Sequence, residues 1–106
     1  MQVDKYTYRV TWSEEDQEHV GLCVEFSGLS YLAETPEAAL KGIRKIVVDA
    51  VKLLKKEGAP VPEPLAQKEY SGKLLLRIPS EIHRKLEIEA RETGISLNRY
   101  INAKIA

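Results

Sequence analysis

The chain has 106 residues, enough for one ordinary domain or for a small domain joined to a dimerisation module. Its 43% hydrophobic and 30% charged residues are typical of a soluble globular chain, and its formal net charge is zero. The single cysteine, Cys23, excludes an intramolecular disulfide and a cysteine-based zinc site. No signal peptide or membrane-spanning run is evident, so we expect a cytoplasmic protein that does not associate with a membrane.

The charge is unevenly distributed along the chain. Residues 1–64 hold eight Lys/Arg against eleven Asp/Glu, a net charge of −3. Residues 65–106 hold eight against five, a net charge of +3. This asymmetry predicts different partners for the two halves, with the basic half favouring a polyanion such as DNA.

The first third of the chain predicts an antiparallel meander. Apolar residues alternate over 6–12 and again over 20–26, and Gly28 precedes a short third strand over 29–33. We expect one face of the second strand, comprising Val20, Leu22, Val24 and Phe26, to be buried. The loop between the first two strands is acidic, with Glu14, Glu15, Asp16 and Glu18. This loop is either a binding site for a metal or a basic protein, or simply a solvated hairpin tip.

A long amphipathic helix is predicted to cover the meander. Thr35 and Pro36 form a strong helix start, and Gly58 is a typical stop. Apolar residues recur between them at three- and four-residue spacing, and we expect this stripe to bury the apolar faces of the strands. Residues 59–64 form a Pro-rich, extended linker. The predicted domains are therefore 1–64, with the linker from 59, and 65–106.

Residues 73–78 predict a strand with no mate in its own chain. Leu74, Leu76 and Ile78 share one face, whereas Lys73, Leu75 and Arg77 share the other. Pro79 ends the strand, and the remainder of the chain is helical. Since a lone strand leaves its backbone groups unpaired, we expect it to pair antiparallel with the same strand of a second copy. Such a two-stranded ribbon fits the DNA major groove.

Two helices are expected after this strand. Ser80 is the expected N-cap of the first, and Gly94 is expected to end it. Ser96 is expected to cap the second, with Ile95 and Tyr100 placed as a hydrophobic staple.

Leu76-Arg77-Ile78-Pro79-Ser80-Glu81, followed by Gly94-Ile95-Ser96-Leu97-Asn98, resembles the ribbon-helix-helix domains of the Arc and MetJ kind. The resemblance implies that Lys73, Leu75 and Arg77 read DNA bases and that Ser96, Leu97 and Asn98 clamp a phosphate. A helix N-terminus is suited to that second role, because its free amides and positive dipole end attract anions. Leu75 departs from the family pattern, in which a polar central reader is commoner, and could contact thymine methyl groups.

The front half resembles the HicB antitoxin domain. The matching stretches are residues 12–16, 28–30, 34–40 and 58–64. The continuation at 70–73 and 96–100 resembles HicB proteins whose C-terminal part is a ribbon-helix-helix domain. The resemblance implies a partial RNase H-like β-β-β-α-β unit that blocks HicA, a small basic RNA-cleaving toxin, while the tail represses the operon. The predicted protein is thus an α+β antitoxin of a type II toxin–antitoxin system. Glu14, Glu15, Asp16 and Glu18 are candidate toxin contacts.

Two functions other than that of an antitoxin have to be considered for this sequence. An RNase H-type enzyme would need carboxylates converging on metal ions, and the acids here are clustered in one loop or scattered. We therefore expect no catalysis, no cofactor and no metal site. A solitary DNA-binding regulator without a toxin is the other possibility. We expect a homodimer through the C-terminal domain and allow for a higher oligomer through the N-terminal domain.

Overall fold

The computed structural model describes residues 2–106, which divide into two compact units. The first unit extends to Tyr70, and the second comprises Ser71–Ala106. The sequence had placed the boundary after Pro64. The first unit extends further because the amide of Leu65 donates a hydrogen bond to Glu25 Oε2 (2.9 Å), which holds the 3-10 helix η2 (Leu65–Gln67) to this unit.

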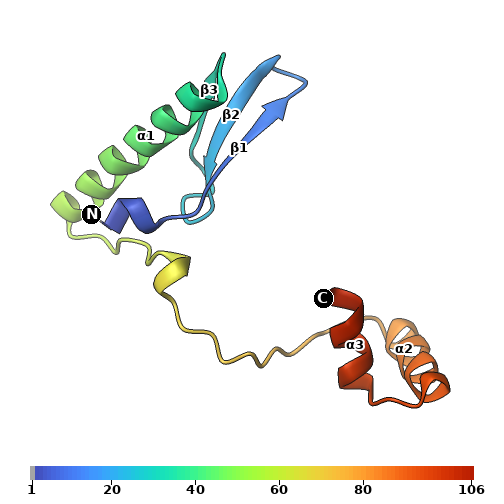
Figure 1. The fold of residues 1–106 in the computed structure, drawn as a ribbon. Helices are drawn as coiled ribbons and strands as arrows, with labels where there is room; N and C mark the ends of the chain where they lie inside the picture. Colours follow the sequence, from blue (N-terminus) through green and yellow to red (C-terminus); the bar gives the residue numbers. More distant parts are fainter. Residues whose placement is uncertain (1) are drawn as a thin grey trace. The chain divides into compact units, whose positions relative to one another are not determined.

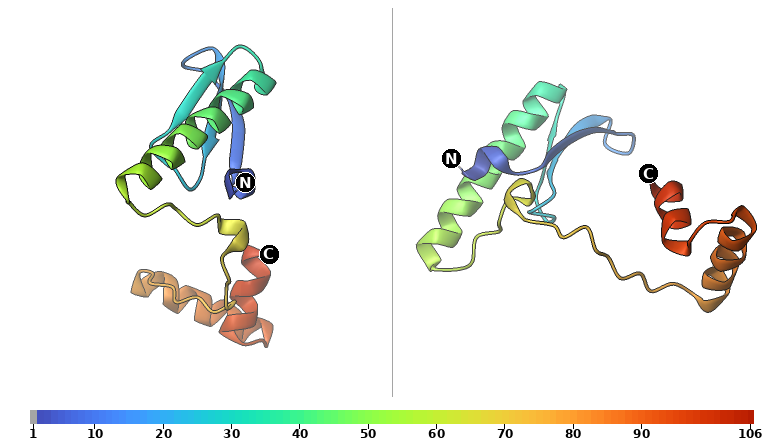
Figure 2. Two further views of the ribbon diagram at one scale, coloured as in Figure 1. Left: turned by 90° about the vertical axis from the view of Figure 1, so that its left-hand side faces the viewer. Right: turned by 60° about the horizontal axis from the view of Figure 1, so that its bottom comes forward.

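The first unit packs one helix on one sheet (Figures 1 and 2). A short 3-10 helix, η1 (Gln2–Lys5), precedes the strands β1 (Tyr8–Ser13), β2 (Glu18–Cys23) and β3 (Ser30–Ala33). The strands form an antiparallel sheet in the order β1-β2-β3, and helix α1 (Pro36–Glu57) covers one of its faces. The predicted α+β meander with a covering helix is therefore confirmed. No strand follows α1 within residues 2–106, so the last strand of the β-β-β-α-β order is not formed in the single chain.

Both ends of α1 lie where the sequence predicts them. The Thr35 hydroxyl accepts a hydrogen bond from the Ala38 amide (3.1 Å), which satisfies one of the free N–H groups of the first turn. Gly58 ends the helix in the left-handed conformation at φ 69°, and its amide donates to carbonyls of the last turn.

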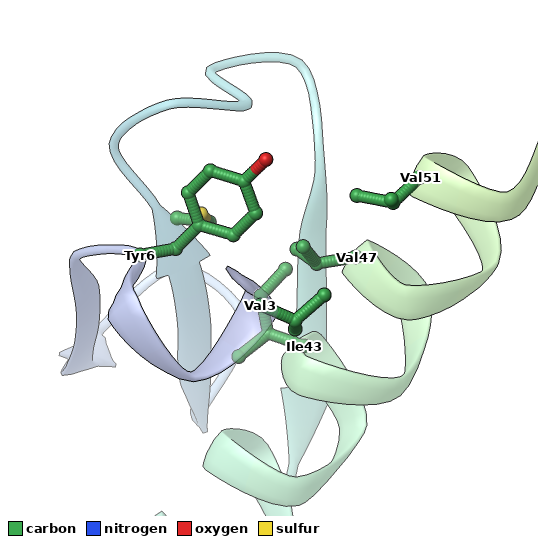
Figure 3. Packing of buried hydrophobic residues seen from close by; sticks show 6 residues of the cluster. Val3, Tyr6, Ile43, Val47 and Val51 are labelled. Carbon is green, nitrogen blue, oxygen red and sulfur yellow. The ribbon is translucent and has the colours of Figure 1, made fainter. Parts of the chain in front are cut away.

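The core of the first unit lies between α1, η1 and the sheet (Figure 3). Its buried members are Val3, Tyr6, Cys23, Ile43, Val47 and Val51. Burying one such Val or Ile side chain fully stabilises the fold by roughly 1.5–3 kcal/mol. Cys23 is one of these buried residues and acts as a small packing residue.

The prediction that α1 covers Val20 and Leu22 is wrong. In the sheet, Tyr8 lies opposite Cys23 and Val10 opposite Gly21, so these four residues share the face under the helix. A Cβ atom on Gly21 would lie 2.4 Å from the carbonyl oxygen of Ala39, which shows how closely the helix backbone approaches β2. Val20 and Leu22 consequently point to the opposite, uncovered face of the sheet.

Glu25 attaches the chain beyond α1 to the sheet. Its carboxylate accepts hydrogen bonds from the amide of Thr7 (2.9 Å), the hydroxyl of Thr7 (3.1 Å) and the amide of Leu65. Nearby, the Tyr6 hydroxyl donates to the carbonyl of Pro62 (2.6 Å). These contacts dock residues 62–65 on the first unit, so the linker is shorter than its composition suggests.

The second unit contains two helices, α2 (Ser80–Thr93) and α3 (Leu97–Ile105). Gly94 follows α2 in the left-handed conformation at φ 75°, as predicted. The N-cap of α2 is Pro79 rather than Ser80, which is the first helical residue and makes no side-chain capping bond. Within residues 2–106, no helix combines the length and apolar character needed to cross a bilayer.

Residues 73–78 form no strand in the single chain. Every residue from 71 to 80 is exposed, and Leu74 and Leu75 are 78% and 80% exposed. The sequence predicts a strand here only when the same segment of a second chain supplies the hydrogen-bonding partner. One chain alone cannot supply that partner.

Candidate nucleic-acid interface

The apolar side of the 73–78 segment adjoins α3. Leu74 and Leu76 line a groove of about 240 Å³ together with Ile101 and Ile105 of that helix. Gly72, Asn98 and Asn102 complete the lining. The segment therefore directs alternate leucines toward α3, as the period of two in its sequence predicts.

Lys73, Leu75 and Arg77 lie at the intervening positions of this segment and are all exposed. Neither Lys73 nor Arg77 forms an ion pair with any residue from 2 to 106. Lys73 and Arg77 lie near the two ends of the segment, within a unit that carries seven Lys/Arg against four Asp/Glu, a net charge of +3. Cationic side chains without an intramolecular partner are available to a polyanion.

The N-terminus of α3 is ordered by its cap. Ser96 adopts an extended backbone (φ −66°, ψ 153°), and its hydroxyl accepts a hydrogen bond from the Arg99 amide (3.1 Å). The first intrahelical bond runs from the Tyr100 amide to the Ser96 carbonyl (2.9 Å). The amides of Leu97 and Asn98 precede that bond, so they belong to the free donors of the first turn. The structure thus brings Asn98 beside Leu74 and Leu76, because all three line one groove.

A hydrogen bond from Tyr100 fixes α3 against α2. Its hydroxyl donates to Glu89 Oε2 (2.6 Å), and this bond, together with desolvation, raises the pKa of Tyr100 above its ordinary value of 10.0. The phenol therefore stays protonated at neutral pH and keeps its role as donor. Tyr100, for which the sequence predicts a hydrophobic staple with Ile95, thus also makes a polar contact between the helices.

The acidic loop of the first unit is a structured hairpin tip. The indole Nε1 of Trp12 donates to Glu14 Oε2 (2.8 Å), and the Ser13 hydroxyl donates to Asp16 Oδ2 (2.8 Å). Gln17 closes the turn at φ 54°, and its side-chain amide donates to the Glu14 carbonyl (2.8 Å). Trp12 remains 47% exposed beside these carboxylates.

Glu14, Glu15, Asp16 and Glu18 are thus gathered at one end of the sheet. Among residues 2–106, no group of three or more His, Cys, Asp or Glu side chains could hold a metal ion. The tip offers negative charge next to an exposed indole. Aromatic side chains of this kind often anchor protein interfaces.

Residues 57–105 match the model of the HicB family. The matched range is just under half of the chain, and this part of the chain is similar to HicB-family proteins. It runs from the end of α1 through the linker and both helices of the second unit. No curated protein and no solved structure matches the chain.

The HicB match and the sequence resemblance overlap only in part. The stretches at 58–64, 70–73 and 96–100 lie inside the matched range, whereas the resemblances at 12–16, 28–30 and 34–40 lie outside it. The assignment of toxin binding to the front half stays a prediction. Sequence reasoning missed the docking role of Glu25, because a single acid in the turn after a strand has no distinctive pattern.

Proposed function

We propose that this protein is the antitoxin of a HicA/HicB-like type II toxin–antitoxin system and has no catalytic activity of its own. Its first unit neutralises a small basic RNA-cleaving toxin, and its second unit dimerises as a ribbon-helix-helix domain that represses the operon. The observation that carries this proposal is the incomplete second unit, whose basic segment and apolar surface both lack partners in one chain, within a region that matches HicB.

Dimerisation is argued from exposed apolar surface. In the second unit, Ala90 is the only buried residue among those described. Ile82, Ile88 and Ile105 remain 47%, 50% and 71% exposed, in addition to the leucines of the 73–78 segment. Exposed apolar surface on this scale is rare in a small monomeric unit and is typical of an interaction site. A second copy would cover it and supply the backbone partner that 73–78 lacks.

DNA binding follows from the side chains that such a ribbon would leave outside. With Leu74 and Leu76 directed to α3, Lys73, Leu75 and Arg77 would project from the opposite face of the paired strands. Arginine and lysine donate to guanine in the major groove, and an aliphatic side chain can contact the thymine methyl group. The Leu97 and Asn98 amides at the capped start of α3 would hold a backbone phosphate, which fixes the register on the duplex.

Toxin binding is assigned to the first unit on electrostatic grounds. This unit has a net negative charge, and Glu14, Glu15, Asp16 and Glu18 concentrate that charge at the hairpin tip. Complementary charge speeds the encounter with a basic protein and disfavours acidic ones. Trp12 would supply the apolar anchor beside the carboxylates.

The test is co-expression of the full chain with the short basic protein encoded by the neighbouring gene, followed by size-exclusion chromatography. We expect the two proteins to co-elute, and replacement of Glu14, Glu15 and Asp16 by the corresponding amides to weaken the complex. A matched control replaces Glu37, Glu57 and Glu63 of the same unit, which removes equal charge elsewhere. Separate elution of the wild-type pair would leave a solitary DNA-binding regulator as the function.

A further inference from the structure

The face of the sheet that α1 leaves uncovered carries most of the apolar residues of the central strand. The register and the alternation of side chains place Val20 and Leu22 of β2 and Leu32 of β3 on it. Leu32 is 43% exposed, and Val24, just beyond β2, is 49% exposed. A pocket of about 300 Å³, lined by Arg9, Leu22, Cys23, Val24 and Ser27, opens at the end of this face near the 24–29 turn.

Two opposite charges lie at the two ends of the same face. Arg9 is paired with Leu22 at one end, and Glu18 is paired with Ser13 at the other. Four residues of strand separate the two levels, or about 13 Å at 3.3 Å per residue. Neither side chain has an ion-pair partner within the described part of the chain.

Val20 lies midway between the two charges along β2. It pairs with Thr11 on one side and with Leu32 on the other. A two-fold axis through Val20 and perpendicular to the strands would bring Arg9 of one copy over Glu18 of the other, and the reverse. The apolar centres of the two faces would then pack against each other at the spacing of about 10 Å that is usual for stacked sheets.

We propose that this open face, comprising Arg9, Glu18, Val20, Leu22, Val24 and Leu32, is a homotypic interface that pairs with the same face of a second copy of the chain. The charge pattern favours this occupant over a basic protein, because a face with one cation and one anion is complementary to its own two-fold image. The antiparallel arrangement also keeps the two acidic hairpin tips apart.

The area of the face determines when the pairing occurs. Three short strands offer far less than the roughly 800 Å² per partner of a stable interface. Pairing of front units therefore depends on a raised local concentration, which dimerisation of the second unit would supply through the short linker. In this respect the inference rests on the proposed function.

Chemical cross-linking of the full chain tests the pairing directly. Val20→Cys places a thiol at the proposed axis, where a short bismaleimide can join two copies. Native Cys23 is 2% exposed, and burial raises the pKa of its thiol, so the wild type is the matched control without a reactive group. We expect covalent dimer from Val20→Cys, and none from the wild type or from Lys45→Cys on the exposed side of α1.

Charge reversal shows whether the proposed face is responsible. In the Val20→Cys background, Arg9→Glu or Glu18→Arg should each lower the cross-link yield at least several-fold, since like charges then face each other. The double reversal should restore it, and this rescue cannot act within one chain because the two positions lie too far apart. Circular dichroism of each variant checks that the sheet is retained.

Sedimentation of the same samples separates this inference from the proposed function. A protein that sediments as a dimer or higher oligomer without cross-linking at Val20 overturns the homotypic face and leaves the DNA-binding dimer standing. A monomer without cross-linking overturns both. Cross-linking that ignores the charge reversals, or that needs an added basic protein, also overturns the inference.

Discussion

At the scale of single residues, Glu25 shows how one carboxylate determines where a linker begins. Its partial burial acts to raise its pKa, but hydrogen bonds from the backbone amides of Leu65 and Thr7 and from the Thr7 hydroxyl outweigh this and lower the pKa below 4.5. The carboxylate is therefore the form that the fold prefers. Its bonds join the turn after β2 to Leu65, 40 positions later in the chain.

The lowered pKa of Glu25 predicts that the folded protein loses stability in acid. Because its folded-state pKa is lowered, its contribution is fully present above the ordinary value of 4.5 and is lost as the pH falls through the folded value. Near neutral pH, Glu25→Gln should lower the free energy of unfolding by about 1–2 kcal/mol, as expected for hydrogen bonds to a charged acceptor. Urea unfolding at several pH values checks this, and a wild type–variant difference that does not shrink in acid would contradict it.

Arg77 should contribute to base recognition. Arg77→Ala is expected to weaken binding to the operator by roughly 1–3 kcal/mol and to relax the preference at one base pair. Gel-shift titration against the operator and single-base variants measures both effects. Lys52→Ala in α1 removes the same charge from the other unit and is the matched control. Unchanged operator affinity in Arg77→Ala would remove this residue from the interface.

At the scale of elements, the contact between α1 and β2 depends on the absence of a side chain. Gly21 has a usual backbone conformation, but the helix backbone occupies the position that a Cβ atom would take. At Gly42 of α1, the ring of Tyr31 occupies the position that a Cβ atom would take. An added Cβ would lie 2.1 Å from Cδ1 of Tyr31. Gly42 thus allows α1 to approach β3 closely.

Gly21→Ala should therefore push α1 away from the sheet. The clash is with backbone, so the helix itself must move, and we expect a loss of about 1–3 kcal/mol in the free energy of unfolding. Gly28→Ala is the matched control, because nothing lies within 4 Å of the added atom. Thermal or urea unfolding of both variants gives the comparison, and equal stabilities would argue against the tight contact.

A substitution at the N-terminus of α3 should change DNA binding in a different way from a substitution of Arg77. Ser96→Asp keeps a good N-cap but places a carboxylate where a phosphate would bind. The helix should be retained, whereas affinity should fall by a similar factor for all DNA sequences. Ser96→Gly, which keeps the amides free without adding charge, should bind nearly as the wild type does. A gel shift on specific and random duplexes would refute the phosphate clamp if Ser96→Asp bound both normally.

At the scale of the whole molecule, the two units differ in how complete they are. The first has a buried core drawn from a helix, a sheet and the docked linker. The second leaves its apolar residues exposed and its extended segment without hydrogen-bonded pairing. A unit in this condition gains most of its stability by association.

The protein should accordingly be a dimer at micromolar concentration, through its second unit. Leu76→Glu, which puts a charge on the apolar side of the ribbon, should dissociate the dimer and melt α2 and α3 while leaving the first unit folded. Sedimentation and circular dichroism measure the two effects. Leu75→Glu, on the other side of the segment, should leave the dimer intact and affect only DNA binding. A wild type that remains a folded monomer would be incompatible with the proposed ribbon.

The amino-acid sequence alone determined the existence and the ends of the local elements. Thr35 and Gly58 bound α1, and Ser96 and Gly94 delimit the turn between α2 and α3, because caps and left-handed residues act through neighbours in the chain. The alternation in 73–78 likewise predicted which leucines turn to α3. These features depend on periods and short-range bonds that can be read from consecutive residues.

Only the tertiary structure decided which face of β2 is buried and where the first unit ends. The apolar pattern of β2 pointed to Val20 and Leu22, yet the register with β1 and the space at Gly21 put the opposite face under α1. The hydrogen bonds of Glu25 moved the boundary of the unit to Tyr70. Both results depend on contacts between residues far apart in the chain, whose energies no local pattern records.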